Sequence, residues 1–145
     1  MIRNTFAARS VTMLGLLGVT LLASPASAHH SFAAEYDSNQ PVTVEGVIDR
    51  VAWVNPHAYV YINVTDENGE VELWAFEALS PNALARQGWT RNSLEAGEEV
   101  TVEGFMAKDG LPLADGSGAV HANSRLITRT DGGRIFSGTA PAGTR

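Results

Sequence analysis

Beyond residue 41 the chain alternates hydrophobic and polar positions in short runs separated by turn residues, a pattern typical of β-strands that are buried on one face. The turn Asp66-Glu67-Asn68-Gly69 separates two such runs, and Asn-Gly is a strong hairpin signal. The strands that this pattern predicts cover 42–54, 58–64, 71–76, 99–107, 120–130 and 134–136.

One segment carries the signals of a helix instead. Ser80 can cap its first turn, Pro81 suits the first helical position, residues 82–87 form the helix and Gly88 ends it. Three strands, a short helix and two further strands is the order of an OB-like barrel, in which the helix would close one end.

A short repeat supports a barrel, because Val-Thr-Val-Glu-Gly occurs at 42–46 and again at 100–104. Both copies alternate inward valine with outward polar residues, and then place glycine where a strand bulges or coils sharply. A β-sandwich is the alternative, but it usually has about seven strands. The sequence therefore predicts an all-β protein, a small OB-like β-barrel of about five to six strands with one short helix.

The first 28 residues are organised like a secretory signal peptide. Arg3 and Arg9 precede a short apolar run at 11–23, and the small residues of 25–28 fit a signal-peptidase site. The run is too short to span a bilayer comfortably, although an uncleaved anchor is the alternative. We expect a periplasmic protein that starts at His29 and does not insert into the membrane. The predicted segments are the signal peptide at 1–28, an irregular segment at 29–41, the barrel at 42–137 and a flexible tail at 138–145.

Charge narrows the classes of partner. Without Arg3 and Arg9, 8 of the 10 Lys and Arg remain against 16 Asp and Glu, a net charge of −8 with His neutral. A domain this acidic repels nucleic acid and anionic membrane surfaces but tolerates cations. We therefore expect no nucleic-acid partner.

The two strands of the hairpin carry aromatic residues. Tyr59 and Tyr61 alternate with the apolar residues of the second strand, and Trp74 and Phe76 do so in the third. If the Asn-Gly turn sets the pairing, these four share one outward face, with His57 at its edge. Such a face is either a platform for a small ligand or an envelope partner, or a second core layer covered by Phe32 and Tyr36 or by the C-terminal segment. The residues assigned to the core are Ala58, Val60, Ile62, Val64, Val71, Leu73 and Ala75.

The histidines suggest a metal site. His29 and His30 open the mature chain, where the α-amine and imidazole of His29 can bind Cu(II), and His30 or His57 can complete the set. The α-amine titrates at about pH 7.7–8.0, so a metal can displace its proton near neutrality. A structural role for His57, which follows the Asn55-Pro56 turn, is equally open, and His121 is the weakest candidate.

No sequence motif indicates an enzyme. The sequence contains no G-x-S-x-G or similar motif around a nucleophilic residue, no phosphate-binding glycine loop and no H-E-x-x-H zinc-protease motif. The acidic positions of the turn lack the spacing of a calcium loop. Glu35, Asp37 and Glu77 could be paired in space for hydrolysis, but nothing in their spacing says so. We expect a protein that binds a metal ion, copper first, or a metal-free module that binds through the aromatic face.

Several short motifs are spread along the expected mature chain. They are His29-His30-Ser31-Phe32, Trp53-x-Asn55-Pro56-His57, Trp74-x-Phe76-Glu77, Ser80-Pro81-Asn82-x-Leu84, Gly88-Trp89, Gly97-x-x-Val100-Thr101-Val102-x-Gly104 and Ala122-Asn123-x-Arg125. Together these motifs resemble a family of exported proteobacterial proteins of unknown function. The resemblance runs across nearly the whole mature chain, and it implies a small periplasmic domain without an assigned reaction. The stretch 111–120 looks longer than the turn usual in that family.

Overall fold

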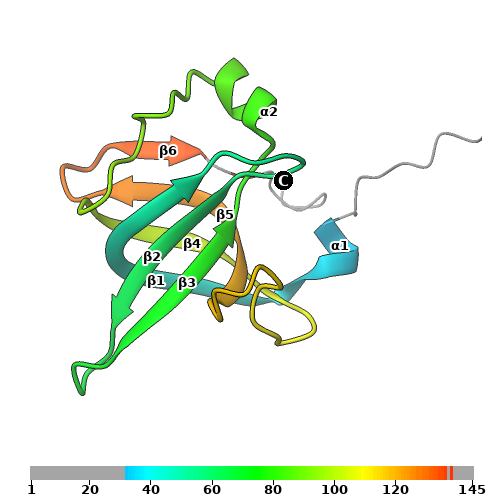
Figure 1. Ribbon diagram of the computed structural model, residues 1–145, viewed down its shortest axis with the longest axis vertical. Helices are drawn as coiled ribbons and strands as arrows, with labels where there is room; N and C mark the ends of the chain where they lie inside the picture. Colours follow the sequence, from blue (N-terminus) through cyan, green and yellow to red (C-terminus); the bar gives the residue numbers. More distant parts are fainter. Residues whose placement is uncertain (1–31, 137, 139–145) are drawn as a thin grey trace, which may run out of the picture.

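Six strands and two short helices make up the part of the chain that the computed structural model describes, residues 32–136 and 138 (Figure 1). The elements are α1 (Phe32–Glu35), β1 (Tyr36–Ala52), β2 (Tyr59–Thr65), β3 (Val71–Glu77), α2 (Pro81–Arg86), β4 (Glu99–Ala107), β5 (Val120–Arg129) and β6 (Arg134–Phe136).

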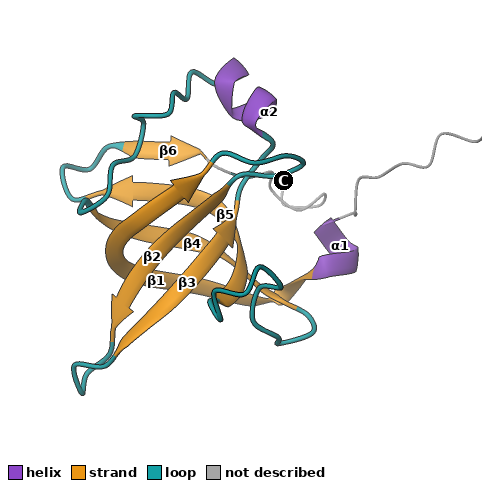
Figure 2. Ribbon diagram, in the orientation of Figure 1, coloured by secondary structure: helices purple, strands orange, loops and turns teal. Residues whose placement is uncertain are grey.

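Five of these strands close into a barrel (Figure 2). β1 pairs with β2 and β4, β2 with β3, and β4 with β5, all antiparallel. The parallel pair of β3 and β5 closes the ring, and β6 continues the sheet beyond β5. This is the strand order of an OB-like barrel, so the predicted fold is confirmed.

The interior of the barrel is apolar, and α2 covers one end of it. Leu84 of α2 is fully buried, and Trp89 after the helix packs in the same cluster. The Ser80 hydroxyl accepts a hydrogen bond from the Ala83 N–H at 3.3 Å, as expected for the predicted cap. The main side chains of the cluster are Ile48, Val60, Ile62, Phe76, Leu84, Val102 and Ile127.

Both glycines of the repeat lie where two strands approach too closely for a side chain. A Cβ on Gly46 would lie 2.5 Å from the backbone oxygen of Asn63, and one on Gly104 would overlap the backbone oxygen of Asn123. The register of β1 with β2 shifts between Ile48 and Arg50, close to the first of these contacts. Glycine therefore allows the strands to bend as the closed barrel requires.

The register of the β2–β3 hairpin differs from the predicted one. A two-residue turn at Asn68-Gly69 would set Tyr61 opposite Phe76. Instead the longer loop 66–70 joins Thr65 to its partner Val71, and Tyr61 pairs with Ala75. The Asp66 carboxylate holds this loop by accepting hydrogen bonds from two backbone N–H groups within it. A shift of one residue turns every side chain of a strand to the other face.

The predicted aromatic face is therefore wrong for the third strand. Trp74 and Phe76 point into the barrel, where Phe76 is fully buried and the two rings stack at 5.7 Å. Tyr59 and Tyr61 do lie on the outer face, so the four aromatic residues do not form one surface. The residues wrongly assigned to the barrel interior are Val71, which is 63% exposed, and Leu73 and Ala75, which pack on the outer face with Tyr61.

The described part of the segment at 29–41 is regular, so the prediction of an irregular segment is wrong there. Residues 32–35 form the single turn of α1, and β1 starts at Tyr36 because its first residues pair with the end of β4. Phe32 anchors the turn through an edge-to-face contact with Phe105, with ring centroids 5.4 Å apart.

Nothing in the described residues forms a helix that is long and apolar enough to cross a membrane. The predicted signal peptide at 1–28 and, apart from Gly138, the predicted tail at 138–145 lie outside the described residues.

Candidate metal centre

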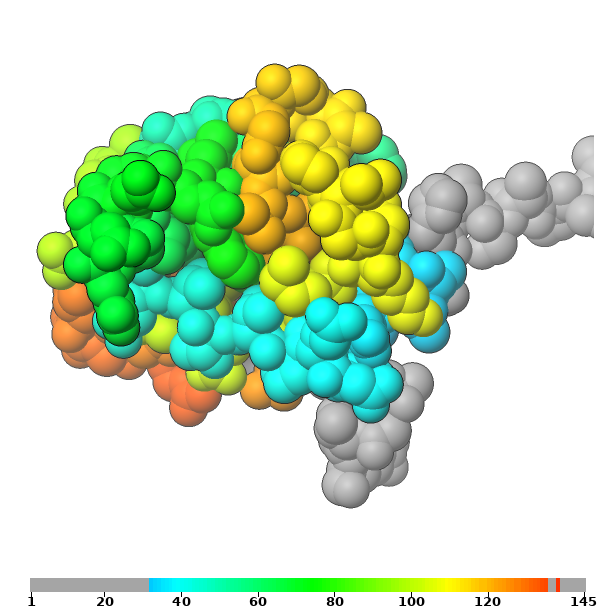
Figure 3. Space-filling view, turned by 90° about the horizontal axis from the view of Figure 1, so that it is seen from below, coloured from blue at the N-terminus to red at the C-terminus, as the bar shows by residue number. Residues whose placement is uncertain are grey.

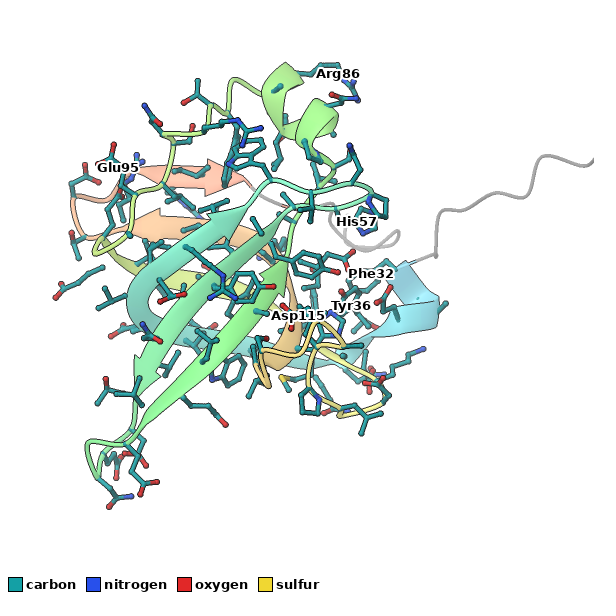
Figure 4. All side chains as sticks on the ribbon, in the orientation of Figure 1. Phe32, Tyr36, His57, Arg86, Glu95 and Asp115 are labelled. Atoms are coloured by element: carbon teal, nitrogen blue, oxygen red, sulfur yellow. The ribbon has the colours of Figure 1, made fainter. Side chains whose placement is uncertain are left out.

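A cluster of polar side chains lies on the outer face of β2, β3 and β5, beside α1. The register explains why they meet: Tyr59 is paired with Glu77 across β2 and β3, and the parallel pairing of β3 with β5 sets His121 beside Ala75. Side chains at paired positions point to the same face of a sheet. Figure 4 shows Tyr36 and His57 on the side of the barrel that α1 faces. The polar cluster consists of Glu35, Tyr36, His57, Tyr59, Glu77 and His121.

The carboxylate of Glu77 is the centre of this cluster. It is 6% exposed at the end of β3. Its Oε2 accepts hydrogen bonds from the hydroxyls of Tyr36 at 2.8 Å and Tyr59 at 3.0 Å, and its Oε1 contacts Nδ1 of His57. Three side chains from separate positions in the chain therefore fix both oxygens of one buried carboxylate.

His121 stands next to this carboxylate through Tyr36. Its Nε2 lies 3.0 Å from the Tyr36 hydroxyl oxygen, and its ring meets the Tyr36 ring edge-on with centroids 5.5 Å apart. His121 is 8% exposed. The hydroxyl of Tyr36 thus lies within hydrogen-bonding distance of both Glu77 and His121.

Glu35 completes a group with the composition of a metal site. One ligand atom each from Glu35, Glu77 and His121 lies within 4.8 Å of the other two. The backbone of Glu35 is held in place because its carbonyl accepts a hydrogen bond from the Lys108 N–H at 2.9 Å. Two carboxylates and an imidazole form a mixed oxygen and nitrogen set that suits first-row transition metals.

Glu35 and His121 also line a cavity of about 380 Å³ between α1 and the loop 108–119. Figure 3 shows this loop, in yellow, beside the N-terminal segment in blue and cyan. The loop is fixed at its far end, where the Tyr61 hydroxyl donates to Asp115 at 2.5 Å. The cavity therefore lies beside two of the three residues of this group.

The electrostatics of the cluster keep its phenols protonated. Burial, followed by the negative charge of Glu77, raises the pKa of Tyr36 and of Tyr59 far above the usual value of a tyrosine. Both hydroxyls therefore remain donors to Glu77 at neutral pH. Burial, followed by a hydrogen bond to Asp115, raises the pKa of Tyr61 to about 12.

Asn123 adds a polar group at the edge of the cluster. Its Nδ2 lies 3.5 Å from the backbone oxygen of Glu77, and its Oδ1 is buried without a hydrogen-bond partner among the described residues. The amide therefore stands beside the strand end that carries Glu77.

The structure brings together only part of the predicted site. His57 contacts Glu77, with a quarter of its side chain exposed, and Tyr59 bonds to the same carboxylate. Tyr61 lies on the same face but bonds to Asp115 instead. Trp74 and Phe76 lie on the opposite side of the sheet, and the predicted ligands His29 and His30 fall outside the described residues.

Sequence reasoning missed the residues that complete the cluster. The sequence indicates Tyr36 only as a cover for the aromatic face, makes His121 the weakest histidine candidate, and gives no spacing that links Glu35 to Glu77. One feature of the sequence could have linked some of these residues, namely the alternation of faces along a strand. Residues 57, 59 and 77 fall on one face of the sheet once the loop 66–70 sets the register of the hairpin. His121 joins them only through the pairing of β3 with β5, which no local pattern encodes.

Comparison with known families gives a definite match over residues 17–115. The chain belongs to a family of unknown function, DUF6152. The match to DUF6152 includes Glu35, His57 and Glu77, and it ends before His121. The resemblance expected from the motifs is therefore confirmed, and membership in DUF6152 brings no reaction with it. No curated protein and no solved structure matches the chain.

Proposed function

We propose that this protein is an exported metal-binding protein, without enzymatic activity, whose barrel binds a transition-metal ion through Glu35, Glu77 and His121. The observation that carries the proposal is the convergence of their three ligand atoms within 4.8 Å, with Glu77 and His121 both buried. Export is inferred from the signal-like organisation of residues 1–28.

The charge of the cluster favours a cation. Glu35 and Glu77 approach each other closely, and two negative charges at this range repel each other. Among the described residues only His57 brings a basic side chain into contact with either carboxylate, and this contact is an ion pair only when the imidazole is protonated. An ion between the two carboxylates would offset this repulsion, whereas a purely structural network needs only one of them.

Copper is the first metal to test, because the mature chain would supply further nitrogen ligands. In the sequence, His29 and His30 come three and two positions before Phe32, the first residue of α1, which carries Glu35. An α-amine with imidazole nitrogens suits Cu(II), and His57 is a further nitrogen near Glu77.

The test is a Cu(II) titration of the exported protein, with its N-terminal residue identified by mass spectrometry and the copper followed by EPR. We expect one-to-one binding, with nitrogen couplings that change when a Met is added before His29. Glu77→Gln should weaken binding at least tenfold, because it removes a charged ligand. Glu99→Gln, at an exposed position on β4, is the matched control and should bind like the wild type. Equal affinity in both variants, or copper bound without a fixed stoichiometry, would contradict the proposal.

A further inference from the structure

We infer that the hydroxyl oxygen of Tyr36 is itself a ligand of the ion bound at this centre, an inference that rests on the proposed function. The geometry points to it, because this oxygen lies 2.8 Å from Oε2 of Glu77 and 3.0 Å from Nε2 of His121. It is thus the one described side-chain atom that lies between two of the three proposed ligand atoms at hydrogen-bonding distance from each.

These distances are those between neighbouring ligands around a six-coordinate ion. For metal–ligand bonds of about 2.0–2.1 Å, adjacent corners of an octahedron are roughly 2.9 Å apart and opposite corners roughly 4.1 Å. The contacts of Tyr36 with Glu77 and His121 match adjacent corners. One ligand atom each from Glu35, Glu77 and His121 lies within 4.8 Å of the other two, a range that includes the distances between adjacent and opposite corners. An ion bonded to Glu77 and His121 would therefore have the Tyr36 oxygen within bonding reach.

Packing against two aromatic rings holds the Tyr36 side chain in this position. Its ring lies between Phe32, at 5.7 Å, and His121, at 5.5 Å between centroids, and the residue is 3% exposed. Its backbone is paired with Ala107 at the end of β4. Because the buried ring packs against two other rings, an ion bound to Glu77 and His121 would meet the Tyr36 oxygen where it lies.

Tyr59 differs from Tyr36 in a way that makes it a positioning residue. Its hydroxyl donates to the same Oε2 of Glu77 at 3.0 Å, but its ring lies 6.4 Å from that of His121 and no hydrogen bond joins the two. Tyr59 therefore orients the carboxylate, whereas Tyr36 bridges two ligands. The two tyrosines form a matched pair for experiment.

With an ion bound to Glu77 and His121, the Tyr36 hydroxyl would give up its proton to solvent and would serve as a phenolate ligand. The resulting set has two carboxylates, one phenolate and one imidazole. Such an oxygen-rich, anionic set selects ions that form phenolate bonds, Cu(II) among them, over ions held by thiolates.

The test uses the exported protein titrated with Cu(II) while its visible absorption is recorded. We expect a phenolate-to-copper charge-transfer band that saturates at one equivalent. Tyr36→Phe should abolish the band and weaken Cu(II) binding about tenfold or more, whereas Tyr61→Phe, which loses only a bond to Asp115, should keep both the band and the affinity. Tyr59→Phe should weaken binding, because it loses the hydrogen bond that orients Glu77, but should keep the band at saturation. Resonance Raman spectra of the wild type, excited within the band, should contain tyrosinate vibrations, and this measurement does not depend on the folding of any variant.

The outcomes separate the inference from the proposed function. One-to-one copper binding without a charge-transfer band, or with a band that Tyr36→Phe retains, overturns the role of Tyr36 and leaves the metal site in place. If Tyr59→Phe removes the band and Tyr36→Phe retains it, the copper ligand is Tyr59, and the inference is overturned as well. The absence of stoichiometric copper binding overturns the proposed function and the inference together.

Discussion

Glu77 is the side chain that holds the polar cluster together, and no sequence motif predicts this role. Its two oxygens contact Tyr36, Tyr59 and His57, and each of these partners occupies a place set by a different feature of the fold. Tyr59 is placed by strand pairing, Tyr36 by the junction of α1 with β1, and His57 by the turn before β2. Removal of one donor should therefore cost the energy of one charge-assisted hydrogen bond without dismantling the others.

Tyr59→Phe should lower the free energy of unfolding by about 1.5–3 kcal/mol, the range for a hydrogen bond to a charged group. Tyr61→Phe is the matched control, because its hydroxyl donates to the exposed Asp115. That variant should lose less than about 1 kcal/mol, since water can replace the lost partner. Urea unfolding of the two variants checks the difference, and equal losses would show that Glu77 is not an especially strong acceptor.

The three tyrosines of the chain should titrate abnormally. The pKa of Tyr61 is raised to about 12, and those of Tyr36 and Tyr59 are raised further, in each case first by burial. We expect the native protein to develop no phenolate absorbance around pH 10, where tyrosines titrate in concentrated urea. A near-ultraviolet titration in both conditions checks this. A native phenolate signal at pH 10 would mean that the outer face is open to water.

The same shifts set the sign of the alkaline stability change. A group whose folded pKa is raised adds stability that is complete below its unfolded pKa of about 10, and loses it as the pH rises through the folded value. Stability should therefore fall above pH 10, and for the contribution of Tyr61 the loss should be complete near pH 12.

At the scale of elements, the strands and the helix were predictable because each has a local signal. Period-two alternation located β2, β3, β4 and β5 to within a residue or so, and Ser80 with Pro81 located α2. The face of β3 was not predictable, because it depends on how many residues the turn contains. Asp66 binds backbone N–H groups of Asn68 and Glu70, which favours the longer loop over the Asn-Gly turn.

The glycines that let the strands bend provide the test at this scale. Gly46→Ala should destabilise the barrel by about 1–3 kcal/mol, because the new methyl group would press on the backbone oxygen of Asn63. Thr43→Ala, at an exposed position of the same strand, is the control and should change stability by less than about 0.5 kcal/mol. Denaturant unfolding measures both, and a neutral Gly46→Ala would show that the strands can separate there without cost.

For the whole molecule, closure of the barrel is what creates the candidate centre. The pairing of β3 with β5 brings His121 beside Glu77 although the two are far apart in sequence, and α1 adds Glu35 from the other end of the chain. Local patterns contain none of this long-range information, which explains why the fold could be predicted from the sequence and most of the centre could not. The N-terminal histidines, which the sequence did single out, stay a prediction.

An ion that bridges elements this distant in sequence should stabilise the entire fold. At a free Cu(II) concentration of 100 times the dissociation constant, binding to the native state alone adds about 2.7 kcal/mol, which for a domain of this size raises Tm by roughly 10 °C. Glu77→Gln should lose most of this increase, while Glu99→Gln, which keeps the centre and changes the net charge equally, should retain it.

Calorimetry with and without copper measures these shifts, and a chelator should reverse them. The acidic surface attracts cations without any specific site, so the measurement belongs at an ionic strength that screens exposed charges. Equal shifts in the two variants would then mean that copper binds to the general negative charge of the protein. A shift lost in Glu77→Gln alone would mean that one ion links α1, β3 and β5, and that the outer face of the barrel is built around it.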